Sequence, residues 1–221
     1  MSNRLRLFIP AVLVAASACL PDVTLETDAQ KASYAIGRNI GTSLVDIQEH
    51  LDMVALMMGV TEALAETESS LTDEEINAAM AAFNEMVQEA ASERGANEGA
   101  AFLEENAARE GVMVTASGLQ YEVLQEGDGE SPVSGQSVTI HYRGALTDGT
   151  EFDSSYGRGA PSTFEVDDLV DGFSEALKLM KVGTSMRVVI PSDLAYGTEG
   201  RLPLIGPNQV LVFEIELLEI E

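Results

Sequence analysis

The sequence is poor in basic residues and in the side chains that build metal and nucleophile sites. Its 221 residues include 12 Lys and Arg against 37 Asp and Glu, which gives a formal net charge of -25. This excludes nucleic acid as a partner, because phosphate contacts need clustered Lys and Arg. With two histidines, one cysteine and no tryptophan, a zinc site or a Cys–His pair has almost no material. We expect no metal and no cofactor.

The common catalytic motifs are also missing. The chain has no G-x-S-x-G, no phosphate loop, no G-x-G-x-x-G and no H-E-x-x-H. Acidic pairs such as Asp167-Asp168 are expected to be solvated surface in so acidic a chain. Since 45% of the residues are hydrophobic, the chain can nevertheless bury a core.

The N-terminus has the pattern of a secretory signal peptide. Arg4 and Arg6 precede an apolar run at residues 7–15, and Ala16-Ser17-Ala18 is a small-residue cleavage pattern. The run is far shorter than the ~20 residues of a membrane-spanning helix. We therefore expect residues 1–18 to be removed and the mature chain to be extracytoplasmic.

Cys19 follows this cleavage pattern directly and has two interpretations. It is either the lipidated first residue of a bacterial lipoprotein, behind a loose lipobox, or an incidental residue after an ordinary cleavage. An unpaired thiol in an oxidising compartment calls for an explanation, and lipidation supplies one.

The distribution of proline divides the chain near residue 111. No proline lies between Pro21 and Pro132, and the strongest helix breaker is thus absent from over a hundred residues. Helices are predicted at residues 28–45 and 51–65.

A third, long helix is predicted at residues 72–110. Thr72 and Glu75 have the spacing of a capping box at its start. Gly95 and Gly99 each weaken it by about 1 kcal/mol relative to alanine. Since large apolar residues become fewer after residue 94, we expect that part to be the more exposed.

Two short helices and half of the long one cannot easily form an independent core. An apolar face falls at helical spacing on Met53, Leu56, Met57, Val60 and Leu64. It could pair with a second copy of the chain or pack against the C-terminal part, and the pattern alone slightly favours packing within one chain.

The part after residue 111 is predicted to be an antiparallel α+β domain. Strands are predicted at residues 119–125, 137–146, 184–190 and 209–220, and one short helix at 173–180. Its aromatic residues, Tyr142, Phe152, Phe164, Phe173, Tyr196 and Phe213, would by themselves be interpreted as core.

Five segments change this interpretation. In order along the chain they are Val138–Gly144, Asp148–Ser155, Gly172-Phe173, Leu194–Gly197 and Leu211–Leu217. Over about residues 112–221 they resemble the FK506-binding-protein (FKBP) family of peptidyl-prolyl isomerases. The resemblance implies a twisted antiparallel sheet wrapped on one short helix.

The N-terminal part of the chain, together with a short segment near the C-terminus, resembles the macrophage infectivity potentiator branch of that family, which includes periplasmic isomerase-chaperones. The matching segments are Lys31–Gly37, Ala101–Leu103, Ser117–Tyr121 and Ile205–Asn208. In that branch, N-terminal helices form a homodimer and a long helix carries the isomerase domain. The resemblance thus implies a dimerisation region at 19–71, a connecting helix at 72–110 and an isomerase domain at 111–221, and it reverses the preference for packing within one chain.

The resemblance also assigns site residues. It gives catalytic positions to Asp153, Tyr196 and Tyr142, and substrate-binding positions to Phe152, Arg158, Leu169, Val170, Phe173, Leu204, Ile205 and Phe213. Phe173 replaces the usual tryptophan at the pocket floor, and Ser162 stands where a large apolar residue is common, which would open one wall.

The implied function is isomerisation of Xaa-Pro bonds in unfolded or partly folded extracytoplasmic proteins. FK506-type macrolides are possible ligands. The expected location is the periplasm or the outer membrane of a Gram-negative bacterium. The alternative is a holdase-type chaperone with weak isomerase activity.

Overall fold

The computed structural model describes residues 24–221, apart from the side chain of Asp46. The predicted signal peptide and Cys19 lie outside this range. The chain divides into two compact units, one ending at Thr61 and the other spanning Glu62–Glu221.

The first unit is helical and leaves its apolar side chains uncovered. It contains α1 (Asp28–Ser43), the 3-10 helix η1 (Val45–His50) and most of α2 (Met53–Leu64). A capping box between Thr27 and Gln30, which was not predicted, fixes the start of α1. Neither α1 nor α2 has a buried residue. The predicted apolar face of α2 is largely exposed, up to 82% at Leu64.

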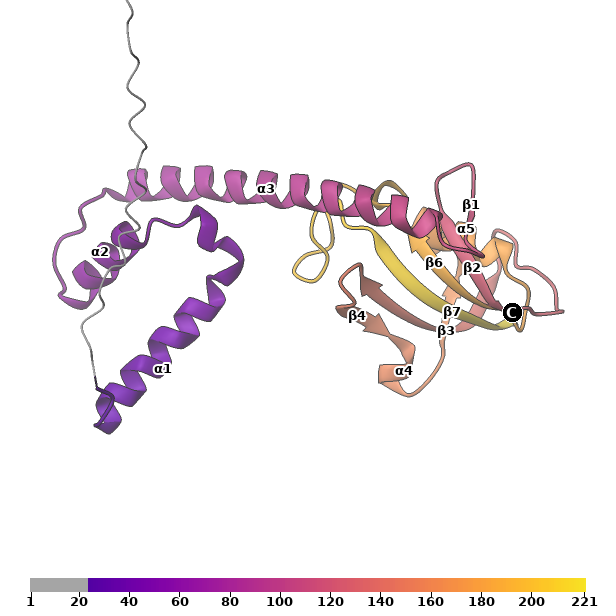
Figure 1. Cartoon of the computed structure of the whole chain (residues 1–221), viewed down its shortest axis with the longest axis horizontal. Helices are drawn as coiled ribbons and strands as arrows, with labels where there is room; N and C mark the ends of the chain where they lie inside the picture. The colour runs from indigo at the N-terminus through magenta and orange to yellow at the C-terminus, as the bar shows by residue number, and fades with distance from the viewer. Residues whose placement is uncertain (1–23) are drawn as a thin grey trace, which may run out of the picture. The chain divides into compact units, whose positions relative to one another are not determined.

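Helix α3 (Asp73–Ala107) confirms the predicted long helix and its capping box. The Thr72 hydroxyl accepts from the Glu75 N–H at 3.3 Å, and the Glu75 carboxylate accepts from the Thr72 N–H at 2.9 Å. The expectation that the helix becomes more exposed after residue 94 is wrong, because its buried residues are Gly95, Gly99 and Asn106. These residues lie where α3 packs on the sheet domain (Figure 1).

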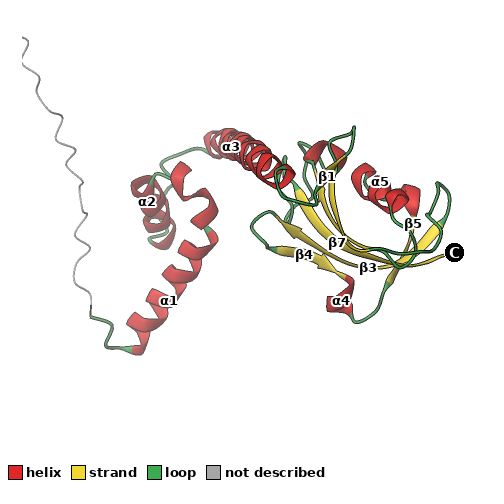
Figure 2. Ribbon diagram, turned by 45° about the vertical axis from the view of Figure 1, so that its right-hand side comes forward, coloured by secondary structure: helices red, strands yellow, loops and turns green. Residues whose placement is uncertain are grey.

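The rest of the second unit is an antiparallel sheet with one main helix on one face (Figure 2). Its strands are β1 (Met113–Val114), β2 (Gln120–Gln125), β3 (Ser137–Leu146), β4 (Glu151–Ser154), β5 (Ser162–Glu165), β6 (Ser185–Ile190) and β7 (Leu211–Ile220). The order is β1-β2-β6-β7-β3-β4, and β5 also pairs with β3. The helices are α4 (Ser155–Arg158) and α5 (Asp171–Leu179), with 3-10 turns η2 (Val166–Asp168) and η3 (Ser192–Leu194).

The core lies between α5 and the sheet. Ala176 and Leu177 of α5 meet Ile140 of β3, Val188 of β6 and Ile215 of β7, all of them buried. The four predicted strands and the predicted helix are present. The α+β class with an N-terminal helical region is therefore confirmed.

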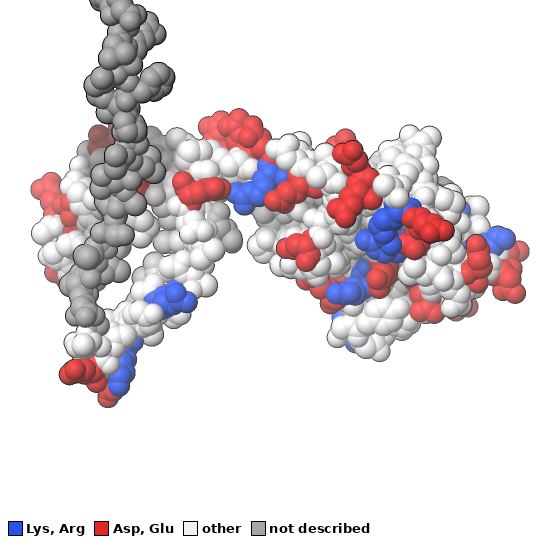
Figure 3. Space-filling view, in the orientation of Figure 1, with Lys and Arg blue, Asp and Glu red and all other residues white. Residues whose placement is uncertain are grey.

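The surface is acidic, and on the face drawn in Figure 3 Asp and Glu are scattered over both units among fewer Lys and Arg. Within residues 24–221, no helix combines the length and the apolar character needed to cross a membrane. The same residues contain no cluster of potential metal ligands.

Candidate active site

A cavity of about 550 Å³ opens at one end of the domain, between β3, β4, β7, the start of α5 and the loop after η3. Its lining residues are Tyr142, Phe152, Asp153, Phe164, Asp168, Leu169, Val170, Phe173, Tyr196, Arg201, Leu202, Pro203, Leu204, Ile205 and Phe213. Most of this wall is apolar, and the few polar groups belong to a small number of side chains.

The aromatic walls meet edge to face. The ring centroids of Phe173 and Phe213 lie 4.9 Å apart at 88°, and those of Phe152 and Phe213 lie 5.6 Å apart at 84°. Tyr142 contacts Phe173 and Phe164 in the same manner, at 6.2 and 5.7 Å. Each contact places a ring edge on a ring face, which aromatic quadrupoles favour. The set therefore forms a closely packed apolar lining.

Strand β3 makes room for these rings at Gly144, two residues beyond Tyr142 on the same face. A Cβ at this position would lie 2.6 Å from Cε1 of Phe213 and 2.7 Å from Cζ of Phe152. Both rings stand directly over the Gly144 backbone, so any larger residue would push the walls apart.

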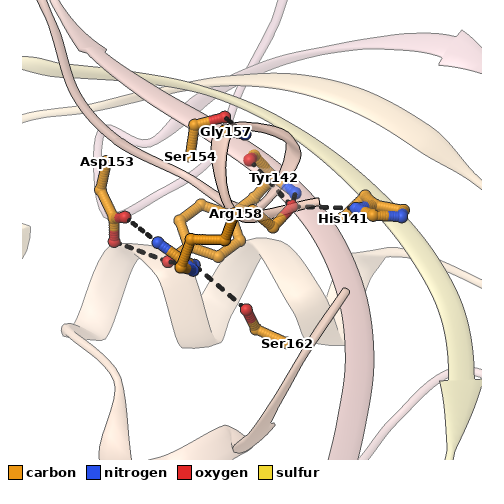
Figure 4. A network of polar contacts seen from close by, with 8 residues as sticks. His141, Tyr142, Asp153, Ser154, Gly157, Arg158 and Ser162 are labelled. Carbon is orange, nitrogen blue, oxygen red and sulfur yellow. Dashed lines mark hydrogen bonds and ion pairs between the residues drawn. The ribbon is translucent and has the colours of Figure 1, made fainter. Parts of the chain in front are cut away.

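A polar network edges the cavity (Figure 4). The Tyr142 hydroxyl donates to Oδ2 of Asp153 at 2.6 Å. Arg158 donates from Nη1 to Oδ1 of Asp153 and from Nη2 to the Tyr142 hydroxyl, the latter at 2.8 Å. Nη2 also donates to the Ser162 hydroxyl at 3.1 Å. Ser162 thus acts as a polar partner of Arg158.

The network sets the charge of its members. Burial alone would raise the pKa of Asp153, but hydrogen bonds from Tyr142 and Arg158, together with the guanidinium charge, lower that pKa below its usual value. Burial raises the pKa of Tyr142, and its hydrogen bond to Asp153 raises it further. At neutral pH Asp153 is therefore a carboxylate that is already hydrogen-bonded, and Tyr142 is a neutral phenol.

The backbone of Tyr142 is held from behind by Ser155, which is fully buried. The Ser155 hydroxyl accepts from the Tyr142 N–H at 2.8 Å and donates to the Tyr142 carbonyl at 3.2 Å. His141 Nδ1 lies 2.9 Å from the same hydroxyl, and the His141 ring stacks on Tyr156. Sequence reasoning missed this support, although Ser155 closes one of the motifs that carried the resemblance.

On the other side of the cavity, Tyr196 accepts a hydrogen bond from Nη1 of Arg201 at 3.1 Å. Because arginine only donates, the phenolic proton of Tyr196 stays available for a ligand. The adjacent loop is closed by reciprocal backbone hydrogen bonds between Arg201 and Ile205, at 2.7 and 3.1 Å. Ile205 is buried at 3% exposure and Leu204 is 60% exposed.

Family models match nearly the whole described chain. Residues 128–218 match the model of the FKBP-type peptidyl-prolyl cis-trans isomerase, and residues 29–123 match the domain amino-terminal to it. The chain belongs to the FKBP-type peptidyl-prolyl cis-trans isomerases.

Similar proteins span both units. The FKBP-type 22 kDa isomerase of Escherichia coli K12 is 41% identical over 201 residues, covering 89% of this chain and 98% of its own length. The outer membrane protein MIP of Legionella longbeachae is 34% identical, and the match covers 93% of this chain and 91% of that protein. The crystal structure of FkpA from Escherichia coli matches with a TM-score of 0.66 at 37% identity, covering 90% of this chain and 99% of that one.

The structure brings together nearly all the site residues expected from the sequence. All the catalytic and substrate-binding candidates line the cavity except Arg158, which reaches it through Asp153 and Tyr142. Cys19 lies outside the described residues. The lining also includes Phe164 on β5, which was not predicted as a site residue and contacts the Tyr142 ring. Strand β5 was itself missed, because four residues give too short an alternation to detect.

Proposed function

We propose that this cavity binds a Xaa-Pro segment of an extracytoplasmic protein and accelerates its cis/trans isomerisation. The barrier is ~18–20 kcal/mol and arises from amide resonance. No bond is made or broken, so no acid, base or cofactor is required. What is required is a site that binds the twisted amide more strongly than either planar form.

The aromatic lining supports this proposal most directly. Twisting removes resonance and reduces the polarity of the amide, so an apolar enclosure stabilises the twisted form relative to the planar ones. Tyr142, Phe173 and Phe213 are 4–6% exposed and present a preformed surface of this kind. The proline ring would lie against Phe173 at the floor.

A few polar groups would orient the peptide. The N–H of Val170, at the N-cap of α5, and the Tyr196 hydroxyl are candidate donors to substrate carbonyls. The Asp153 carboxylate lines the cavity and would interact electrostatically with the amide before proline as it twists. Its partners Tyr142 and Arg158 keep it ionised and in place.

The test is turnover of a short Xaa-Pro peptide by the purified protein, followed by NMR exchange with and without FK506. Turnover that FK506 inhibits supports the proposal. The matched variant Tyr196→Phe, which removes only the donor hydroxyl, should keep the fold and lose turnover. A folded protein with no turnover would refute the proposal.

A second candidate function is holding unfolded clients. The exposed apolar side chains of the first unit favour it, among them Met53, Met57 and Leu64 at 54–82% exposure. Suppression of the aggregation of a proline-free client would support this function. Because such a client has no Xaa-Pro bond, isomerisation could not explain the result.

The same side chains support a homodimer formed by the first unit. Packing α1 and α2 against a second copy would cover apolar area that is otherwise unpartnered. Met57→Glu should shift the mass in analytical ultracentrifugation from dimer to monomer. The control Ala96→Glu adds the same charge on an exposed position of α3 and should stay dimeric.

The proposed location is the periplasm or the outer membrane, with a lipid anchor on Cys19. The support is the signal-like N-terminus and the name of the Legionella longbeachae relative, which is called an outer membrane protein. Labelled palmitate should enter the wild-type chain in a Gram-negative host and not the Cys19→Ala variant. If neither the wild-type chain nor the variant is labelled, the proposal of a lipid anchor is refuted.

A further inference from the structure

Helix α3 contacts the base of the loop that borders the cavity. Leu202, Pro203, Leu204 and Ile205 line the cavity. Three residues after Ile205, the Asn208 side chain donates from Nδ2 to the Ser92 hydroxyl at 2.8 Å and to the Ser92 carbonyl at 3.2 Å. Ser92 lies in the middle of α3, more than a hundred residues earlier in the chain.

Asn208 is also tied to the other side of the cavity. Its backbone N–H donates to the carbonyl of Gly197 at 2.8 Å, next to Tyr196. The carbonyl of Tyr196 in turn accepts from the Gly200 N–H at 3.1 Å. Asn208 has a φ of 54°, which asparagine tolerates better than most residues. One residue thus joins α3, the end of the loop and the segment of Tyr196.

Helix α3 presents two glycines at this junction, so it contributes no side chain of its own at these two positions. A Cβ at Gly95 would overlap the carbonyl oxygen of Pro207, and one at Gly99 would lie 2.9 Å from Cγ2 of Val210. Glycine in a helix interior costs about 1 kcal/mol relative to alanine. At both positions the close approach of α3 to residues 207–210 accounts for that cost.

A second anchor prevents α3 from following the loop if the loop moves. Asn106, 3% exposed, donates to Oε1 of Gln120 on β2 at 2.8 Å and accepts from Arg187 on β6 at 2.8 Å. Gln120 donates back to the carbonyl of Leu103 at 2.9 Å. The C-terminal part of α3 is therefore fixed to the sheet, and residues 207–210 rest on a fixed support.

We propose that Asn208 is a positioning residue of the active site, through which α3 holds the loop at residues 201–205 and the Tyr196 segment in the geometry that binds substrate. The inference rests on the proposed function of the cavity. It makes the connecting helix part of the catalytic machinery of its own chain, in addition to its role in linking the two units.

Asn208→Gly tests this, since glycine accepts the positive φ and removes only the side-chain amide. We expect kcat/KM for the peptide to fall about three- to tenfold, which is within the range for the loss of a side-chain hydrogen-bonding group, and FK506 affinity to fall similarly. Ser92→Ala removes one of two acceptors and should have a smaller effect. Because Ser92 acts only through Asn208, the double variant should match Asn208→Gly rather than the product of the two effects.

A spectroscopic readout separates positioning from general stability. In protein labelled with 3-fluorotyrosine, the ¹⁹F resonance of Tyr196, assigned by its loss in Tyr196→Phe, should shift or broaden in Asn208→Gly. The resonances of Tyr121 and Tyr156, which lie outside the cavity lining, should not. Asn97→Ala raises helix propensity on an exposed position of α3 and is the control for changes within the helix.

The inference is overturned by unchanged kcat/KM and an unchanged Tyr196 resonance in Asn208→Gly, or by multiplicative effects in the double variant. If Asn208→Gly does not fold, Ser92→Ala tests the same contact, and we expect a smaller change in the Tyr196 resonance. An unchanged Tyr196 resonance in Ser92→Ala would then overturn the inference. If the wild-type protein has no turnover, the proposed function fails, whereas the ¹⁹F comparison still reports whether α3 holds the Tyr196 segment.

Discussion

Replacing Asp153 with leucine tests whether the polar edge of the cavity contributes to catalysis or only to structure. In the wild-type protein the carboxylate accepts from the Tyr142 hydroxyl at 2.6 Å and from Arg158. Leucine has the same number of side-chain heavy atoms, branched at the same atom, and removes both acceptor oxygens. The Tyr142 hydroxyl would then keep only the hydrogen bond that it accepts from Arg158.

The expected loss of stability is small. Asp153 and Arg158 have side-chain exposures of 43% and 49%, and exposed ion pairs contribute about 0–1 kcal/mol. The hydrogen bond from Tyr142 adds about 1 kcal/mol. Unfolding free energy should therefore fall by no more than about 2 kcal/mol. If the carboxylate interacts with the twisted amide, losing one charge-assisted contact lowers kcat/KM about 10–100-fold.

The two quantities are measured by urea unfolding and by NMR exchange on the same Xaa-Pro peptide. Asp128→Leu, at an exposed loop position away from the cavity, is the matched control and should change neither. A 10–100-fold loss of kcat/KM with less than about 2 kcal/mol of destabilisation supports a role in catalysis. Wild-type kcat/KM in Asp153→Leu would refute the reasoning and leave Asp153 as a structural group.

The pKa of Asp153 is lowered and that of Tyr142 is raised. The network should therefore lose its stabilising effect only as pH falls below about 4 or rises above about 10. We expect kcat/KM to be constant from pH 5 to 9, and a change centred near pH 6–7 would contradict this. Gly144→Ala should push Phe152 and Phe213 apart. We expect the free energy of unfolding, measured by thermal unfolding, to fall by about 1–3 kcal/mol and FK506 binding to weaken. Unaltered FK506 affinity would show that the walls tolerate a methyl group. A fragment of residues 111–221 should fold, because the core lies within it. Its free energy of unfolding in urea should be about 2–3 kcal/mol lower than that of a fragment of residues 73–221. Equal unfolding free energies would show that the contacts of α3 do not stabilise the domain.

The long regular elements were predictable because their patterns repeat. The predicted strand at 137–146 coincides with β3, and the predicted start of the long helix at Thr72 is its N-cap. Strands β4 and β5, four residues each, were not predicted. They are defined by pairing with β3 rather than by their own alternation.

The site was predictable only as a set. Each aromatic residue could equally be core, and the residues of the cavity come from distant segments that only the fold brings together. Ser162 illustrates the limit. From the sequence it looked like a missing apolar wall, whereas the structure turns its hydroxyl to the Arg158 guanidinium. The identity of a polar residue does not reveal which neighbour will hydrogen-bond to its side chain.

Gly95 and Gly99 are also positions where the local sequence is misleading, because it predicts exposure and the structure buries them. Helix propensity correctly counts each as a local weakness, and the scarcity of large apolar side chains around them indicates an exposed helix. Both observations are local, whereas the close approach of Pro207 and Val210 is tertiary. A helix that must touch another backbone needs its smallest residues at the contact. Its most buried part can therefore look, in the sequence, like its least stable and most solvated part.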